Sequence, residues 1–443
     1  MKLVQITPGA GGMYCGNCFR DNALVAALRR QGHDTVMVPL YLPMTLDEAS
    51  TAGDTPTFFG GINVYLDQKL PWYRHAPRWL RALADSPALL RWAAGKTAKT
   101  RADDVGELTV SMLQGERGNQ ARDLTELTEW LRHLAPVDAV FLSNALLAGF
   151  ARQLRKQPGG RVVCFLQSEE TFLDTMPEPW RSRSWETLRE RAADVDLWIS
   201  PSTYFAGRMS NRLGISPERM RVVPNGIALE GYDRLPERPP RCPGEPLSMG
   251  FFARMCPDKG LDLVVESFIA LRRTGKFPQL RLRVGGGCGP GDFAFVEEQK
   301  ARLQAVGLLA DASFHPNVSR EEKIAFYASC DVLSVPSRMS ESFGLYLIES
   351  LAAGTPLVQP SVVGFPEILE ATGGGVLAGP NTAAALVSAL EPLLLDPARL
   401  HALGRAGRAA VFADYSDEAM ARRTVAALAP ESVSGTRRST VAA

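Results

Sequence analysis

Short apolar runs alternate repeatedly with helix-patterned segments in both halves of this chain. The runs are rich in β-branched and aromatic residues, and the segments between them carry apolar residues at helical spacing. Parallel strands need a crossover, usually a helix, so this alternation predicts parallel sheets covered by helices. The runs are KLVQIT, DTVMVPL, DAVFLS, RVVCFLQ, DLWISPS and RMRVVPNG in the first half, and LSMGFFA, LRLRVGG, DVLSVPS, TPLVQPS and GGVLAG in the second.

A proline-rich stretch, DRLPERPPRCPGEP at 233–246, separates the halves and is predicted to be an irregular linker. The predicted fold is therefore α/β, with two Rossmann-like, doubly wound domains facing each other across a cleft. Ligands of such domains bind at the carboxyl ends of the strands. The predicted segments are a first domain at 1–235 with a helical insertion at 45–135, a second domain at 236–415, a helix at 416–429 that packs back on the first domain, and a disordered tail at 430–443.

Composition excludes several classes of protein. The 443 residues carry a net charge of +1, which gives no nucleic-acid signature. The start has no signal-peptide pattern and no apolar run is long enough to span a bilayer, so we expect a cytoplasmic protein. Seven cysteines do not form a disulfide framework, and the pair Cys15 and Cys18 has no second pair to complete a zinc site. A metal or redox role for this pair is therefore disfavoured.

Two acidic residues frame the most informative stretch, ESFGLYLIESLAAGTPLV. A helix is predicted from Gly344 to Gly354, so Glu341 precedes the helix and Glu349 lies within it. A helix N-terminus suits a phosphate, and a carboxylate further along suits ribose hydroxyls. The alternative is that Glu341 caps the helix and Glu349 faces solvent.

Two further elements favour a phosphate ligand. Arg254 and Lys259 lie on a strand-to-helix turn of the second half, where they are placed to clamp a diphosphate. Gly11 and Gly12 follow the first strand, where missing Cβ atoms allow a ligand close to the backbone. Taken alone, the cation pair is better explained as two surface ions, and the glycine pair has a simple strand-to-helix turn as its alternative.

Together these motifs resemble the family 4 retaining glycosyltransferases, which have the GT-B fold of two Rossmann-like domains. The resemblance covers most of the chain except 45–135 and the tail. It includes the glycine loop and GHDTVMVPL, SPSTYFAGRM, VVPNGI, ARMCPDKG, VPSRMSESFGLYLIESLAAGTPLV and GFPEILEATGGGVLAGP.

The resemblance implies a donor site for a sugar linked to UDP, GDP or ADP, with no cofactor and no metal. Arg254 and Lys259 would neutralise the diphosphate, Glu349 would bind ribose, and Glu341 would lie near the sugar. Transfer would retain the anomeric configuration by attack on the face from which the diphosphate leaves. The remaining donor positions are the amides of Ser342, Phe343 and Gly344, the helix start at Leu345, the first-domain glycines Gly11 and Gly12, and Gly286 and Val318 near the base.

The acceptor side departs from the family pattern. Many members carry a histidine where this chain has Gln167, which cannot act as an acid or base. Glu169 or Glu170 is a candidate to supply the missing acidity. Between the glycine pair and the GH that closes the first helix, this chain is about four residues, or one helical turn, longer than its relatives. The stretch from Tyr14 to Cys18 is the predicted addition, and we expect it to be a ligand-facing loop near the acceptor. The acceptor-side candidates are Gln167, Tyr14, Asn17, Glu169 and Asn225.

The basic segment 71–101 has no match in the family. It contains three tryptophans, seven Lys or Arg and one acid, Asp85. The favoured interpretation is core-covering helices, and the alternative is peripheral contact with the inner face of the membrane. The expected partners are a nucleotide sugar and a sugar, lipid-linked or small-molecule acceptor, with no nucleic acid.

Other functions share parts of this pattern. An epimerase of the same fold and a nucleotide-sugar-binding protein without transfer both remain open, the second because of Gln167. A glycogen-type phosphorylase lacks its pyridoxal lysine stretch, and no Gly-x-Gly-x-x-Gly supports an oxidoreductase. The pair Asp194 and Asp196 resembles a weak metal-binding motif of another glycosyltransferase fold, and we predict no metal there.

Overall fold

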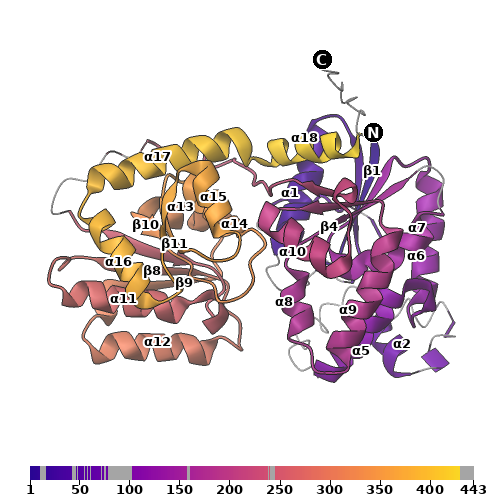
Figure 1. The fold of residues 1–443 in the computed structure, drawn as a ribbon, viewed down its shortest axis with the longest axis horizontal. Helices are drawn as coiled ribbons and strands as arrows, with labels where there is room; N and C mark the ends of the chain where they lie inside the picture. The colour runs from indigo at the N-terminus through magenta and orange to yellow at the C-terminus, as the bar shows by residue number, and fades with distance from the viewer. Residues whose placement is uncertain are drawn as a thin grey trace, which may run out of the picture.

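The computed structural model describes most of the chain in two α/β lobes that lie side by side (Figure 1). The predicted tail lies outside the described residues. The described residues are 1–9, 16–41, 46, 48–53, 55–56, 58–59, 61–70, 72–73, 76–77, 102–156, 160–237, 239 and 245–429.

The first lobe is built on a parallel six-stranded sheet in the order β2-β1-β3-β4-β5-β6. Strand β1 pairs with β3 in a register that places Leu3 opposite Ala139. The chain winds outward from β1 to β2 and then returns to β3, so the winding direction reverses between β1 and β3. The strands are β1 (Lys2–Thr7), β2 (Asp34–Pro39), β3 (Ala139–Leu142), β4 (Arg161–Phe165), β5 (Leu197–Ser200) and β6 (Met220–Val222).

Helices cover both faces of the first sheet, and each face has its own apolar core. The strands are almost wholly apolar because both faces are buried. The helices and 3-10 turns of this lobe are α1 (Gly16–Arg30), α2 (Gly61–Lys69), α5 (Ala102–Gln114), η3 (Gly115–Arg117), α6 (Ala121–Leu134), η4 (Ala145–Phe150), α7 (Ala151–Leu154), α8 (Glu169–Asp174), α9 (Trp180–Arg191), η5 (Ala192–Asp194), α10 (Thr203–Leu213) and η6 (Pro217–Arg219).

The second lobe repeats the architecture with the order β12-β11-β10-β7-β8-β9, again all parallel. Its winding direction reverses between β7 and β10, where Met249 lies opposite Val332. The strands are β7 (Ser248–Phe252), β8 (Arg281–Gly286), β9 (Ala312–Pro316), β10 (Val332–Leu333), β11 (Leu357–Pro360) and β12 (Gly375–Ala378). Both sheets confirm the predicted fold class.

One strand of the second sheet was missing from the sequence prediction. Strand β9 is an edge strand, and none of its five residues is fully buried. An edge strand needs less apolar surface, so its sequence, ASFHP, lacks the β-branched signal of the central strands.

The remaining helices cover the second sheet and then cross back to the first lobe (Figure 1). Helix α18 packs on α1, where Met420, Ala421 and Leu428 join Leu24 and Leu28 in one apolar cluster. The domain boundaries themselves stay a prediction. The elements are η7 (Pro257–Lys259), α11 (Leu261–Arg273), α12 (Phe293–Ala305), η8 (Leu309–Asp311), α13 (Arg320–Ser329), α14 (Leu345–Ala352), α15 (Phe365–Thr372), α16 (Ala383–Leu394), α17 (Pro397–Asp414) and α18 (Asp417–Leu428).

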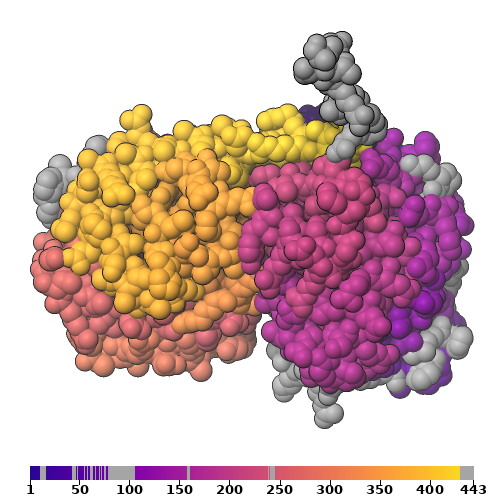
Figure 2. Space-filling model, in the orientation of Figure 1, coloured from indigo at the N-terminus to yellow at the C-terminus, as the bar shows by residue number. Residues whose placement is uncertain are grey.

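The space-filling view shows the two lobes in contact, with an indentation between them at the lower edge (Figure 2). Among the described residues, no helix has both the length and the apolar character to cross a membrane. The predicted membrane-contact segment, 71–101, lies almost entirely outside the described residues.

Candidate functional site

The predicted donor residues lie at the reversal point of the second sheet. Arg254 follows β7, and the loop that carries Glu341 follows β10, the neighbouring strand. Since the carboxyl ends of parallel strands meet at one edge, the topology brings these two segments together. This is the position at which doubly wound sheets bind ligands.

Two helix N-termini, one from each lobe, meet at this edge. Gly16 begins α1 and Leu345 begins α14, and both residues line one pocket. A Cβ atom on Gly16 would lie 4.0 Å from Leu345 Cδ1, so the two helix starts lie close together. Each end carries partial positive charge and unpaired amides, which together favour an anion.

Lys259 and Glu341 form an ion pair beside this pocket. The Lys259 Nζ to Glu341 Oε2 distance is 2.5 Å, and the Tyr346 hydroxyl donates to the same oxygen over 3.2 Å. Burial and the nearby Glu341 charge raise the pKa of Tyr346 well above its usual value, so the hydroxyl keeps its proton. Both predicted residues are thus brought together, with Tyr346 as an additional partner.

Arg254 is held by Asp292, a residue that the sequence did not single out. The Arg254 Nε lies 3.1 and 3.0 Å from the two Asp292 oxygens, and Asp292 also accepts from the Gly289 amide. The hydrogen bonds to Asp292 raise the pKa of Arg254. The Asp292 side chain is 5% exposed and the Arg254 side chain 65%, so a buried carboxylate presents an accessible guanidinium.

Glu349 is fixed by two groups of α13. Lys323 Nζ lies 2.8 Å from Glu349 Oε1, and the Tyr327 hydroxyl donates to Oε2 over 3.0 Å. Burial, followed by the charge of Glu349, raises the pKa of Tyr327 well above its usual value. The signal for these partners was the four-residue spacing of Lys323 and Tyr327, which places them on one helix face.

The pocket contains more cationic than anionic side chains. Four cations and two anions lie in its described wall, and each cation has an acidic partner, because Asp21 and Asp292 pair with two of the arginines from behind the wall. Such a wall suits the diphosphate of a nucleotide sugar. The charged wall residues are Arg20, Arg254, Arg320 and Lys323, with Glu48 and Glu349.

Gly286 and Val318, the predicted base-side positions, also line the pocket. Their two loops are joined by Asn317, whose side chain exchanges two hydrogen bonds with the Cys288 backbone at 3.0 and 2.8 Å. Asn317 has a φ of 53°, which asparagine tolerates better than most residues.

The other predicted donor positions do not form the pocket wall. Lys259, Glu341, Ser342, Phe343 and Gly344 are absent from it. Phe343 is buried in the second core, and the Ser342 amide donates to Ser168 Oγ of the first lobe over 2.8 Å. The donor role of these amides stays a prediction.

On the acceptor side, the structure brings Gln167 to Asn225. Gln167 Nε2 lies 3.5 Å from Asn225 Oδ1, and neither residue lines the pocket. Glu169 is buried and its Oε1 accepts from the Ala145 amide over 2.8 Å. Burial raises the pKa of Glu169 to about 7, a value at which a carboxyl exchanges protons near neutral pH.

A buried pair on α1 was not predicted. Arg20 is 1% exposed and lies 3.0 Å from Asp21, with its guanidinium 4.0 Å from the centre of the Phe165 ring. Arg20 Nη2 donates to Ser143 O over 2.8 Å. No sequence pattern separates Arg20 from an ordinary exposed helix arginine.

The predicted N-terminal glycine loop, with Gly11, Gly12, Tyr14 and Cys15, lies outside the described residues. Residues Gly16 to Cys18 form the first turn of α1, with Cys18 fully buried and Asn17 half-buried outside the pocket wall. This part of the stretch Tyr14–Cys18 is therefore helical, because α1 starts earlier than predicted.

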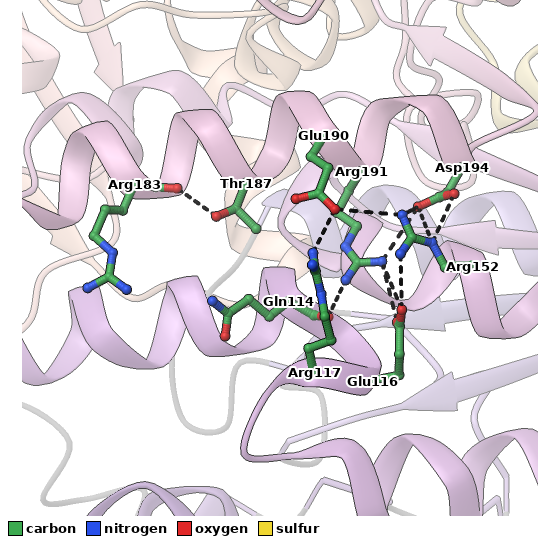
Figure 3. A network of polar contacts seen from close by, with 9 residues as sticks. All are labelled: Gln114, Glu116, Arg117, Arg152, Arg183, Thr187, Glu190, Arg191 and Asp194. Atoms are coloured by element: carbon green, nitrogen blue, oxygen red, sulfur yellow. Dashed lines mark hydrogen bonds and ion pairs between the residues drawn. The ribbon is translucent and has the colours of Figure 1, made fainter.

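Asp194 and Asp196 have arginine partners. Asp194 contacts Arg152 at 3.0 Å and Arg191 at 3.6 Å, within the network of Figure 3. Asp196 accepts from the Val162 amide over 2.8 Å and lies 3.4 Å from Arg155. In the part of the chain that the structure describes, no group of three or more His, Cys, Asp or Glu residues is arranged to hold a metal ion.

Two family models match the chain, one in each half. A family model described as glycosyl transferases group 1 matches residues 237–410, and one described as glycosyltransferase family 4 matches 95–230. The chain is 31% identical over 237 residues to the D-inositol 3-phosphate glycosyltransferase of Nocardia farcinica, an alignment that covers 52% of this chain and 51% of that protein. The chain thus spans about half the length of the first curated relatives it matches.

Two further similarities extend over more of the chain. It is 27% identical over 293 residues to the GDP-mannose-dependent alpha-(1-6)-phosphatidylinositol monomannoside mannosyltransferase of Mycolicibacterium smegmatis, which covers 63% of this chain and 70% of that protein. The fold matches the sucrose-phosphate synthase structure from Thermosynechococcus elongatus with a TM-score of 0.69 at 19% identity, over 96% and 97% of the two chains. The predicted family and fold are confirmed: the chain belongs to the family 4 glycosyltransferases and has the GT-B fold.

Proposed function

We propose that the protein transfers a sugar from a nucleoside diphosphate sugar to an acceptor hydroxyl, with retention of anomeric configuration and without a metal ion. The observation that carries this proposal is the pocket between the lobes. It combines two neighbouring helix N-termini, the accessible guanidinium of Arg254 and a candidate for ribose binding, Glu349.

The leaving diphosphate would be stabilised by Arg254 and Lys259. Arg254 is accessible and held in place by Asp292, and Lys259 currently neutralises Glu341. A bound donor would give Lys259 a second anionic partner. Charge that develops on the diphosphate is then met by fixed cations and amides, which supports catalysis without a metal.

In the proposed step, the bond between the anomeric carbon and the phosphate oxygen breaks, and its electron pair goes to the diphosphate. The acceptor oxygen forms a new bond to the same face of the anomeric carbon. Its proton passes to a phosphate oxygen of the leaving group, so no protein nucleophile is needed. Glu341 would contact the sugar, and Gln167 would donate a hydrogen bond to a sugar hydroxyl.

We also propose a polyol or a phosphorylated or lipid-linked polyol as the acceptor class. This proposal draws on the two relatives, one named as a D-inositol 3-phosphate glycosyltransferase and the other as a phosphatidylinositol monomannoside mannosyltransferase. The donor base stays open among uracil, guanine and adenine.

The test is a transfer assay with UDP-, GDP- and ADP-linked hexoses against inositol phosphates and free sugars, in EDTA. Proton NMR of the product then reads the anomeric configuration. We expect one donor class to react and the product to keep the α or β configuration of its donor. An inverted product, or turnover that requires magnesium, would refute the proposed mechanism.

Donor binding without transfer is a second candidate function, favoured by Gln167, which has no ionisable group. It predicts saturable binding of one nucleotide sugar and no product with any acceptor. Transfer at any measurable rate by the parent, lost in Arg254→Ala, would eliminate it.

A further inference from the structure

The segment that carries Glu341 is held by the first lobe. Its neighbours Ser340 and Ser342 make the contacts between the lobes. The contacts of the Glu341 side chain described above are with Lys259 and Tyr346, both in the second lobe. The backbone on either side of Glu341 is therefore fixed by one lobe and its carboxylate by the other.

Ser342 is held on both sides of its backbone. Its amide donates to Ser168 Oγ over 2.8 Å, and its carbonyl accepts from Ser202 Oγ over 2.6 Å. Both Ser202 and Ser342 are buried, with 1% and 4% exposure, so water does not compete for these bonds.

Ser340 is held in the same way. Its carbonyl accepts from Thr171 Oγ1 over 3.2 Å, and its hydroxyl donates to Glu170. Glu170 is 1% exposed and is oriented by Arg208, whose Nε lies 2.6 Å from the same carboxylate oxygen.

Ser168 has an unfavourable backbone conformation, which is explained by its hydrogen bond to the amide of Ser342. It follows β4 with φ 63° and ψ 30°, a left-handed conformation that is rare outside glycine and asparagine. Strained residues of this kind gather at functional sites because the surroundings hold them in place. Here the conformation accompanies the bond from Ser168 Oγ to the segment beside Glu341.

We propose that Ser168, Glu170, Thr171 and Ser202 form an interdomain clamp that positions Glu341 for sugar transfer when the lobes are closed. The four are positioning residues, since they act on Glu341 through Ser340 and Ser342. The proposal rests on the proposed function and adds that donor-site geometry depends on side chains of the acceptor-side lobe.

The first test is hydrogen–deuterium exchange of the full chain without ligand, read on a peptide that spans 338–346. Ser168→Gly removes the acceptor oxygen and keeps the left-handed backbone, so it should fold. We expect exchange in this peptide to be about fivefold faster than in the parent, because the amide of Ser342 loses its partner. Unchanged exchange would overturn the clamp.

A matched control is Glu367→Ala. Glu367 also bridges the lobes, by accepting from the amides of Thr203 and Tyr204 at 2.8 and 3.1 Å, and it does not touch Ser340 or Ser342. We expect this variant to leave exchange at 338–346 unchanged. An equal increase in both variants would indicate general opening of the lobes and would overturn a specific clamp.

The second test separates positioning from binding, with the donor found in the transfer assay. In Ser168→Gly we expect kcat to fall about tenfold while the Kd of the matching nucleoside diphosphate stays within about twofold. Ser168→Asn, which tolerates the backbone and restores an acceptor oxygen, should recover part of kcat. Faster exchange with unchanged kcat would refute the positioning role. A parent protein that is inactive with every donor would refute the proposed function, and the exchange experiment would still test whether the clamp exists.

Discussion

Two clusters of acidic and basic side chains in this molecule have opposite characters. The first is the network of Figure 3, where ion pairs between Arg117, Arg152 and Arg191 and the acids Glu116, Glu190 and Asp194 join η3, α7, α9 and η5. Its charges cancel, and Arg191 at its centre is fully buried. The second is the pocket between the lobes, where each of the four wall cations also has an acidic partner but the Arg254 side chain stays 65% exposed. A buried ion network stabilises the fold, whereas an ion pair with an accessible guanidinium can still bind a ligand.

The largest expected effect is on stability, from Arg191→Ala. The change leaves Glu116 and Asp194 short of a partner inside the network of Figure 3. Removing one member of a buried ion cluster costs about 3–5 kcal/mol. Urea unfolding should show this loss in the free energy of unfolding. Arg117→Ala, an exposed member with one contact to Glu190, should lose no more than about 1 kcal/mol, and equal losses would contradict the distinction.

Arg254→Ala should lower activity and leave stability nearly unchanged, the reverse of the emphasis expected for Arg191→Ala. We expect kcat/KM to fall about 10²–10³-fold, since one electrostatic contact to the transition state is lost, with little change in Tm. Steady-state kinetics and thermal melting measure the two. The control is Arg281→Ala. Arg281 is also half-exposed and paired with an acid, Asp311, but it lies away from the pocket, so this variant should leave kcat/KM unchanged. An equal drop in kcat/KM in both variants would show that activity depends on the net charge of the protein and not on Arg254 in particular.

Glu169 predicts a pH effect on folding. Its pKa is raised to about 7 in the folded protein, so folding favours the protonated carboxyl. The favourable contribution is complete below the unfolded pKa of about 4.3 and is lost as pH rises through about 7. Over this range the free energy of unfolding should fall by about 3 kcal/mol from this group. In Glu169→Gln the fall between pH 4.5 and 8 should shrink, and an identical pH profile would refute the assignment.

The smallest effect tests the support of Glu349. Tyr327→Phe removes one hydrogen bond to this carboxylate, so the nucleotide Kd should rise about fivefold, or about 1 kcal/mol. Calorimetric titration measures it. Tyr73→Phe, which loses a tyrosine hydroxyl bond to Asn63 in the other lobe, should bind as the parent does. Unchanged affinity in Tyr327→Phe would place ribose binding elsewhere.

Only some of the residues in these two clusters could be predicted from the sequence. The places of Arg254, Lys259, Glu341 and Glu349 at one edge of the second sheet could be predicted because each lies at a fixed offset from a strand end or a helix start, and their roles toward a donor stay a prediction. Eleven of the strands were predicted from apolar runs, and edge strand β9 was not, because it is less buried.

Contacts between distant segments could not be predicted. Arg191 meets Glu116 across 75 residues, and Ser342 meets Ser168 across 174. The partner Asp292 meets Arg254 across 38 residues, which no local pattern encodes. The same holds for Arg20, whose burial depends on how α1 packs against Phe165.

The central claim is that protein cations and helix ends, without a metal, hold a nucleoside diphosphate between the lobes. The most direct test is calorimetric titration of UDP, GDP and ADP into the full chain in EDTA, repeated with magnesium. We predict that one nucleotide binds in EDTA, that magnesium does not tighten its binding, and that Arg254→Ala weakens it at least about tenfold. Binding only with magnesium, or equal binding by Arg254→Ala, would contradict the account.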